Sequence, residues 1–161
     1  MSKTVSDQSL CIRKATLDDT SAISGLILSL AHHFLLQADG SGAESFLRSL
    51  GPEGIARNIA APELDYYVGS AGGQLIGVVA VRNRMHLFHL FVDQPFQRGG
   101  VARALWAHVK EVYGWPSASG PTTVNSTPFA QAFYERMGFH AVGARLEKNG
   151  IAFVPMQLAQ A

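Results

Sequence analysis

The most informative segment of the chain is Leu90-Phe91-Val92-Asp93-Gln94-Pro95-Phe96-Gln97-Arg98-Gly99-Gly100-Val101-Ala102. An apolar run ends at an Asp/Pro break, a basic and glycine-rich turn follows, and an amphipathic segment begins at Val101. This order predicts a strand, a tight loop and the N-terminus of a helix. A helix start exposes unpaired backbone N–H groups and the positive end of the helix dipole, and glycine lets an anion approach closely. The stretch therefore predicts a phosphate-binding turn beside a strand end.

The bulk composition limits the class of protein. The chain has 161 residues, enough for one domain with a real core, and its net charge of +1 argues against nucleic acid as the main partner. It contains no apolar stretch long enough for a transmembrane helix, and its polar N-terminus lacks the apolar core of a signal peptide. We therefore expect a cytoplasmic protein without a membrane partner, with a single domain over 1–161 and a flexible tail at 1–9.

The remaining segments predict an α/β (α+β) domain with one central mixed sheet. The single cysteine, Cys11, excludes an intramolecular disulfide, and its apolar neighbours predict a buried structural thiol in the first strand. The helix over 101–113 is the clearest, because apolar residues recur on one face and Gly114 ends it. The expected order is a strand at 10–15, helices from 16 to 34 and 44–50, a hairpin of 66–68 and 75–81, a strand at 85–92, the helix at 101–113, a strand at 122–125, a helix from Thr127 to Met137, and a hairpin of 141–146 and 151–158.

The glycine pattern is weak evidence when taken alone. A second copy, Gln37-Ala38-Asp39-Gly40-Ser41-Gly42, follows a helical segment, so we interpret it as a loop between helices. Neither turn has the Gly-Lys-Ser/Thr of a P-loop, and the Rossmann spacing of glycines and acid is missing. For the copy after Val92, a plain strand-to-helix turn remains the alternative to a phosphate site.

A second motif makes the first one specific. It is Asn125-Ser126-Thr127-Pro128-Phe129-Ala130-Gln131-Ala132-Phe133-Tyr134-Glu135-Arg136-Met137-Gly138-Phe139. Together the two motifs resemble the GNAT superfamily of N-acetyltransferases: 97–102 is similar to its pyrophosphate loop, and 130–139 to its Ala-x-x-Phe-Tyr-x-x-x-Gly-Phe helix. The resemblance spans 10–158. It implies a twisted, mixed, mostly antiparallel sheet of about seven strands, flanked by about four helices and splayed between the fourth and fifth strands.

The resemblance also implies acetyl-CoA or coenzyme A as co-substrate, and no metal. The backbone of 90–92 would pair with the pantetheine arm like an added strand, and the N–H groups of 97–102 would meet the pyrophosphate. Arg98 and Arg103 either meet phosphate charge or are solvated, and both interpretations stay open. The residues implied in binding are Leu90, Phe91, Val92, Gln97, Arg98, Gly99, Gly100, Val101, Ala102, Arg103, Asn125, Ala130 and Phe133.

Two candidates for proton transfer follow from the resemblance and the residue types. Tyr134 is implied as the general acid that protonates the leaving thiolate, with a core aromatic as its alternative. His86 and His89 would lie on opposite faces of a regular strand, so one of them could face the cleft. We take His89 as the candidate base, because it is nearer the end of the strand; a structural role is the alternative. His32 and His33 point apart and predict no metal site, but they could line the acceptor entrance.

Two functions from different classes remain open. The first is an enzyme that moves an acetyl group from acetyl-CoA to a primary amine by direct attack in a ternary complex. The second is a non-catalytic CoA-binding regulatory or sensor domain of the same fold. No acidic cluster around 32–50 or 147–150 indicates a polyamine, so a small molecule or a peptide remains open as the amine acceptor. The oligomeric state is open too, since homodimers are frequent in the family.

Overall fold

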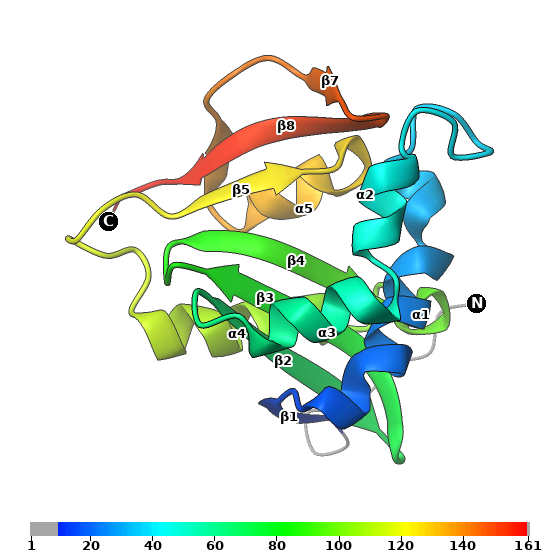
Figure 1. Cartoon of the computed structure of the whole chain (residues 1–161). Helices are drawn as coiled ribbons and strands as arrows, with labels where there is room; N and C mark the ends of the chain where they lie inside the picture. The colour runs from blue at the N-terminus through cyan, green and yellow to red at the C-terminus, as the bar shows by residue number, and fades with distance from the viewer. Residues whose placement is uncertain (1–9, 161) are drawn as a thin grey trace.

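The computed structural model describes residues 10–160 (Figure 1), so the expected tail at 1–9 lies outside the described residues. Within them, the strands are β1 (Cys11–Lys14), β2 (Leu64–Ala71), β3 (Gln74–Arg82), β4 (His86–Val92), β5 (Thr123–Ser126), β6 (Phe139–Ala141), β7 (Leu146–Lys148) and β8 (Ile151–Leu158). The helices are α1 (Thr20–Ser29), α2 (Glu44–Ser49), α3 (Pro52–Ala60), α4 (Val101–Tyr113) and α5 (Gln131–Arg136). Short 3-10 turns are η1 (Leu17–Asp19), η2 (Ala31–His33), η3 (Gln94–Phe96) and η4 (Pro128–Ala130).

The strands form one mixed sheet that divides into two arms. Its order is β1-β2-β3-β4-β5-β8-β6, with β7 paired to β8, and every pairing is antiparallel except β4 with β5. The parallel pairing holds only at two positions, His86 with Thr123 and Leu87 with Val124. Beyond them β5 diverges from β4, as Figure 1 shows. The mixed sheet and its splay between the fourth and fifth strands are confirmed.

Helices cover both faces of the sheet. Val79 and Val81 of β3 join the core beneath α4, and the intervening Val78 and Ala80 join the core beneath α1 and α3. Helix α4 approaches the sheet closely at Gly77 of β3, where an added Cβ would lie 2.8 Å from the Leu105 side chain. A glycine at this point therefore lets α4 lie directly on the sheet. No helix within residues 10–160 is long and apolar enough to cross a membrane.

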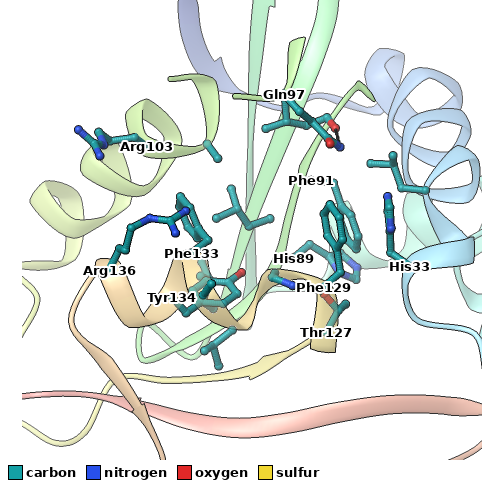
Figure 2. A pocket seen from close by; sticks show the side chains of 18 of the residues that line it. His33, His89, Phe91, Gln97, Arg103, Thr127, Phe129, Phe133, Tyr134 and Arg136 are labelled. Atoms are coloured by element: carbon teal, nitrogen blue, oxygen red, sulfur yellow. Dashed lines mark hydrogen bonds between the residues drawn. The ribbon is translucent and has the colours of Figure 1, made fainter. Parts of the chain in front are cut away.

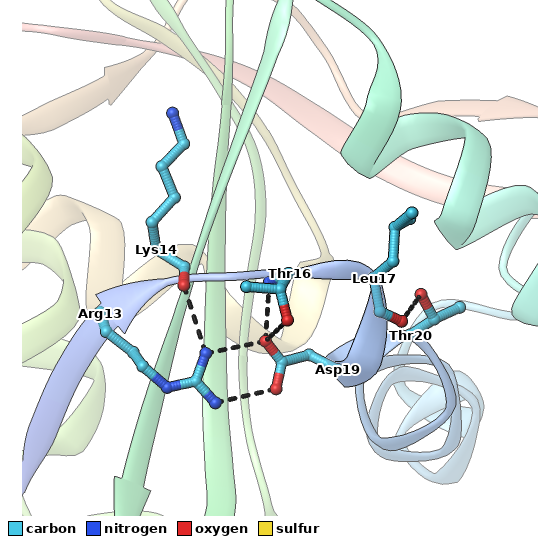
Figure 3. Close-up of polar contacts among 6 residues, drawn as sticks. All are labelled: Arg13, Lys14, Thr16, Leu17, Asp19 and Thr20. Atoms are coloured by element: carbon cyan, nitrogen blue, oxygen red, sulfur yellow. Dashed lines mark hydrogen bonds and ion pairs between the residues drawn. The ribbon is translucent and has the colours of Figure 1, made fainter.

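A polar contact fixes the turn that leads into α1. Arg13 of β1 donates both guanidinium nitrogens to the Asp19 carboxylate, at 2.8 and 2.9 Å. The same carboxylate accepts from the Thr16 backbone N–H, which completes a capping box at η1 (Figure 3). The Arg13 guanidinium and the Thr16 amide hold the pKa of Asp19 below its usual value, although its burial opposes them. The expected helix start at Thr16 is thus a 3-10 turn that continues into α1.

Three details differ from the sequence predictions. Cys11 is exposed on β1, an edge strand, and is not a buried thiol. The predicted strand over 141–146 does not form as one strand, because β6 ends at Ala141 and β7 begins at Leu146. The four residues between them lie opposite only two residues of β8, and one of these is Pro155, which has no N–H to donate. Helix α3 was not predicted at all, although Pro52 at its first turn is a typical helix start. The described residues therefore form eight strands and five α-helices, where about seven and four were expected.

A β-bulge interrupts β4 where the two arms separate. Ala80 of β3 pairs with His89, and the next residue Val81 pairs with Leu87, so Phe88 is an extra residue in the ladder. The bulge breaks the regular alternation on which opposite faces for the two histidines depended. The rings of His89 and Phe88 lie against each other, with centroids 4.3 Å apart.

Candidate active site

A cavity of about 640 Å³ opens where β5 leaves β4. Strands β4 and β5, the start of α4, helix α5 and the segment after α1 supply its walls. Its lining residues are Leu30, His33, Leu87, Phe88, His89, Leu90, Phe91, Val92, Gln97, Arg98, Gly100, Ala102, Arg103, Val124, Asn125, Thr127, Phe129, Ala130, Ala132, Phe133, Tyr134 and Arg136. Figure 2 shows ten of them by name.

One wall is an unpaired strand edge. Since β5 pairs only with the first two residues of β4, the stretch 88–92 has no neighbouring strand on that side within the described residues. The Gln97 side chain donates from Nε2 to the Val92 carbonyl at 2.9 Å, which ties the loop to the end of the strand. An extended ligand with amide groups can add to such an edge as a further strand.

The strand edge leads into an open helix start. Gly100 caps α4 with φ +90°, a left-handed conformation that favours glycine, and no side chain caps the helix. An added Cβ at Gly100 would meet no atom of the described residues within 4 Å, so this side of the residue is open. Arg98 adds positive charge to the rim of the cavity. The unpaired N–H groups and the helix dipole make this an anion-binding end.

The cavity gathers most of the residues expected from the sequence. Those that line it are His89, Leu90, Phe91, Val92, Gln97, Arg98, Gly100, Ala102, Arg103, Asn125, Ala130, Phe133 and Tyr134. Gly99 and Val101 do not line it. The Val101 side chain is buried in the core beneath α4, so the expectation for this residue rests on its backbone N–H alone. In Figure 2 the Arg103 side chain is directed away from the other labelled residues.

Tyr134 stands on α5 with its hydroxyl toward the middle of the cavity (Figure 2). Its side chain is 5% exposed, and its ring packs edge-on against Phe133 and Phe139. Burial is the only cause that raises the pKa of its phenol, and no residue among 10–160 hydrogen bonds to the hydroxyl. The phenol is therefore protonated at neutral pH and has a proton to donate.

His89 is buried at the floor of the cavity. Its ring lies among Tyr66, Phe88 and Phe91, with centroids 4.3 to 5.9 Å away. Burial lowers its pKa to about 3, so the imidazole is uncharged at neutral pH. Its Nε2 is buried and has no hydrogen-bond partner within the described residues. His86, the other candidate, is occupied by a 2.8 Å hydrogen bond between its Nδ1 and Thr123 Oγ1.

The sequence did not predict the ring contact between His33 and Phe129, which both line the cavity. His33, in the turn after α1, stacks on Phe129 of η4 with ring centroids 3.8 Å apart and planes inclined by 19° (Figure 2). The sequence offered His33 only as one of two adjacent histidines that could line the acceptor entrance. Nothing in the sequence indicated Phe129 as its partner, since the two elements meet only through the fold. Leu30, Thr127 and Arg136 also line the cavity without having been expected there.

Comparisons with known proteins place this architecture. A family model described as an acetyltransferase (GNAT) domain matches residues 34–160. The fold is similar to a GCN5-related N-acetyltransferase from Rhodopseudomonas palustris, at 16% identity and TM-score 0.76 over 94% of this chain and 96% of that chain. It is similar to the PaiA N-acetyltransferase of Thermoplasma acidophilum in complex with coenzyme A, at 13% identity and TM-score 0.68 over 94% and 99%.

A third similar structure is a spermidine N-acetyltransferase variant from Vibrio cholerae, at 17% identity and TM-score 0.64 over 94% of each chain. The search of curated proteins found no match. At these identities the likeness to solved structures concerns the fold, while the family model covers most of the chain. The splayed sheet and the matched model agree, and the chain belongs to the GNAT acetyltransferase family.

Proposed function

We propose that the protein is an acetyl-CoA-dependent N-acetyltransferase that acts on a primary amine in a ternary complex. One observation carries the proposal: the unpaired edge of β4 is followed, after η3 and a short loop, by the uncapped N-terminus of α4. A strand edge recognises an extended amide chain, and a helix start recognises a pyrophosphate. Acetyl-CoA combines these two groups in one molecule. In the protein, the loop that Gln97 ties to Val92 connects the strand edge to the helix start.

The residues present fit this donor. The free space in front of Gly100 admits a phosphate, and Arg98 supplies positive charge beside it. Asn125 lines the opposite arm and is exposed, so its amide is available to the pantetheine region. The donor brings an activated acetyl group as a thioester. The chain itself has to orient that group, admit the amine and move protons.

The reaction is a direct transfer. The lone pair of an uncharged amine forms a bond to the thioester carbonyl carbon, the carbon–sulfur bond breaks, and its electrons leave with the sulfur. We assign Tyr134 as the proton donor to that sulfur, because its phenol is protonated, unpartnered and directed into the cavity. We assign His89 as the acceptor of the amine proton through its free Nε2. A weak base suffices at that moment, because nitrogen becomes strongly acidic as the new bond forms.

A second candidate function is favoured by one observation. Among the described lining residues there is no aspartate or glutamate, so the cavity offers no carboxylate base and suits a coenzyme A sensor without turnover. Two measurements distinguish the candidates: calorimetry of coenzyme A binding, and release of free thiol from acetyl-CoA with a panel of amines. A saturable, amine-dependent rate supports the enzyme and ends the sensor hypothesis. Binding without thiol release for every amine contradicts the enzyme.

A further inference from the structure

The charge of the cavity restricts which amines it can hold. Among the described residues, the charged side chains that line it are all arginines, namely Arg98, Arg103 and Arg136. An alkylammonium ion entering the cavity would thus find no carboxylate there to pair with its charge. Burying an unpaired cation costs several kcal/mol or forces it to lose its proton. The lining therefore disfavours amines that are cationic at neutral pH, polyamines most of all.

The side of the cavity formed by His33 and Phe129 is aromatic. The Phe129 ring is 59% exposed and stacks on His33 through one face, which leaves the rest of the ring open. Phe91 and His89 continue the aromatic surface toward the floor of the cavity. A planar ring lying against Phe129 would gain stacking as well as burial of apolar area.

The two histidines on this side are uncharged at neutral pH. The Nε2 atoms of His33 and His89 are both buried without a hydrogen-bond partner within the described residues. Burial, and for His33 also the neighbouring His32, lowers the pKa of each imidazole. Such imidazoles hydrogen bond to a neutral N–H group, but they cannot remove the proton of an alkylammonium ion efficiently. The site thus lacks the base that a strongly basic amine needs.

We propose that the acceptor is a weakly basic aromatic amine, held with its ring against Phe129 and its nitrogen toward His89. This inference rests on the proposed acetyl transfer and names its substrate class. An aromatic amine is uncharged at neutral pH, so it enters a cavity lined without carboxylates without desolvating a cation, and it attacks without prior deprotonation. The absence of a carboxylate then matches the substrate, and does not indicate a lost activity.

Three amines of similar size test the two properties separately. Aniline is aromatic and weakly basic, benzylamine is aromatic and strongly basic, and cyclohexylamine is strongly basic without an aromatic ring. At pH 7 a simple alkylamine is uncharged in on the order of one molecule in a thousand. We expect kcat/KM for aniline, measured as thiol release with acetyl-CoA, to exceed the values for both other amines by at least about tenfold. The difference is smaller than the ratio of uncharged fractions because alkylamines are the stronger nucleophiles.

The pH profiles add a second readout. Between pH 7 and 8, kcat/KM for aniline should stay flat, while the slow rate with benzylamine should rise by about tenfold, in step with its uncharged fraction. A higher kcat/KM for benzylamine or cyclohexylamine than for aniline would overturn the proposed acceptor class and leave acetyl transfer standing. No thiol release with any amine, spermidine included, would overturn the proposed acetyl transfer itself.

A variant tests whether the ring of the acceptor lies against Phe129. Phe129→Leu keeps an exposed apolar side chain but removes the ring, so KM for aniline should rise roughly three- to tenfold while the Kd of coenzyme A stays unchanged. Val112→Ala, at another exposed apolar position outside the cavity, is the control and should change neither value. An unchanged KM for aniline in the Phe129 variant would contradict the assigned position of the ring.

Discussion

Replacing Tyr134 with phenylalanine separates the chemical role of this residue from its packing. The substitution removes only the hydroxyl, since the ring contacts with Phe133 and Phe139 are retained. No residue among 10–160 hydrogen bonds to that hydroxyl, so folding loses no hydrogen bond. Losing a poorly solvated hydroxyl should instead stabilise the protein by zero to about 1 kcal/mol. For a domain of this size 1 kcal/mol corresponds to a rise in Tm of roughly 2–4 °C.

The effect on turnover should have the opposite sign. Loss of a positioned general acid lowers kcat by on the order of 10²- to 10⁴-fold, while the Kd of coenzyme A should change little because the phenol acts mainly as the bond breaks. Thiol release gives kcat, calorimetry gives Kd, and urea denaturation gives the free energy of unfolding. If Tyr134→Phe keeps kcat and its free energy of unfolding falls by more than about 1 kcal/mol, the hydroxyl has a structural partner and is not the proton donor.

Three further predictions concern the backbone and the buried histidines. Gly100→Ala should cost about 1–2 kcal/mol in urea denaturation, because φ there is +90°, and calorimetry should show weaker coenzyme A binding because the new Cβ occupies the space in front of α4; unchanged affinity would contradict the assigned phosphate position. Gly77→Ala should lower the free energy of unfolding by about 1–3 kcal/mol, because the added Cβ would lie 2.8 Å from the Leu105 side chain. Leu105→Val in the same protein should recover part of that loss, and strictly additive losses would contradict the contact. Stability should fall as the pH decreases from 6.5 toward 4, because the pKa values of His86 and His89 are lowered by burial to about 4 and about 3, so the unfolded chain takes up protons that the folded chain does not. The expected slope is about 1.4 kcal/mol per pH unit for each histidine, and denaturation midpoints that are constant between pH 6.5 and 5 would contradict it.

The segments that the sequence predicted best carry their own local signals. The helix over 101–113 has an apolar face and a glycine at each end, and both Gly100 and Gly114 adopt the left-handed conformation. Thr127 caps η4 through its hydroxyl, which accepts from the Ala130 N–H, as the Thr-Pro pair indicated. These features involve neighbours in the chain, so the sequence alone specifies them. The family resemblance then supplied the splay, which is a property of the whole sheet.

The features that escaped prediction depend on distant contacts. The bulge at Phe88 adds one apolar residue to an apolar strand, and this leaves no mark in the pattern. Helix α3 is short and carries Gly54 as its third residue, which weakens a helical pattern. The structure explains this glycine, because a Cβ there would clash with the Ser49 carbonyl at the end of α2. The stack of His33 on Phe129 likewise exists only once the two arms of the sheet are in place.

The divergence of β5 from β4 has a thermodynamic consequence. The sheet opens between β4 and β5, and the backbone groups of 88–92 have no strand partner on that side within the described residues. On the proposed function, the donor fills this opening and completes the ladder, so it binds the folded chain and not the unfolded one. Such a ligand stabilises a protein by RT ln(1 + [L]/Kd), which is about 2.7 kcal/mol at a hundredfold excess over Kd. The lifetime of this protein in a cell would then follow the local supply of acetyl-CoA.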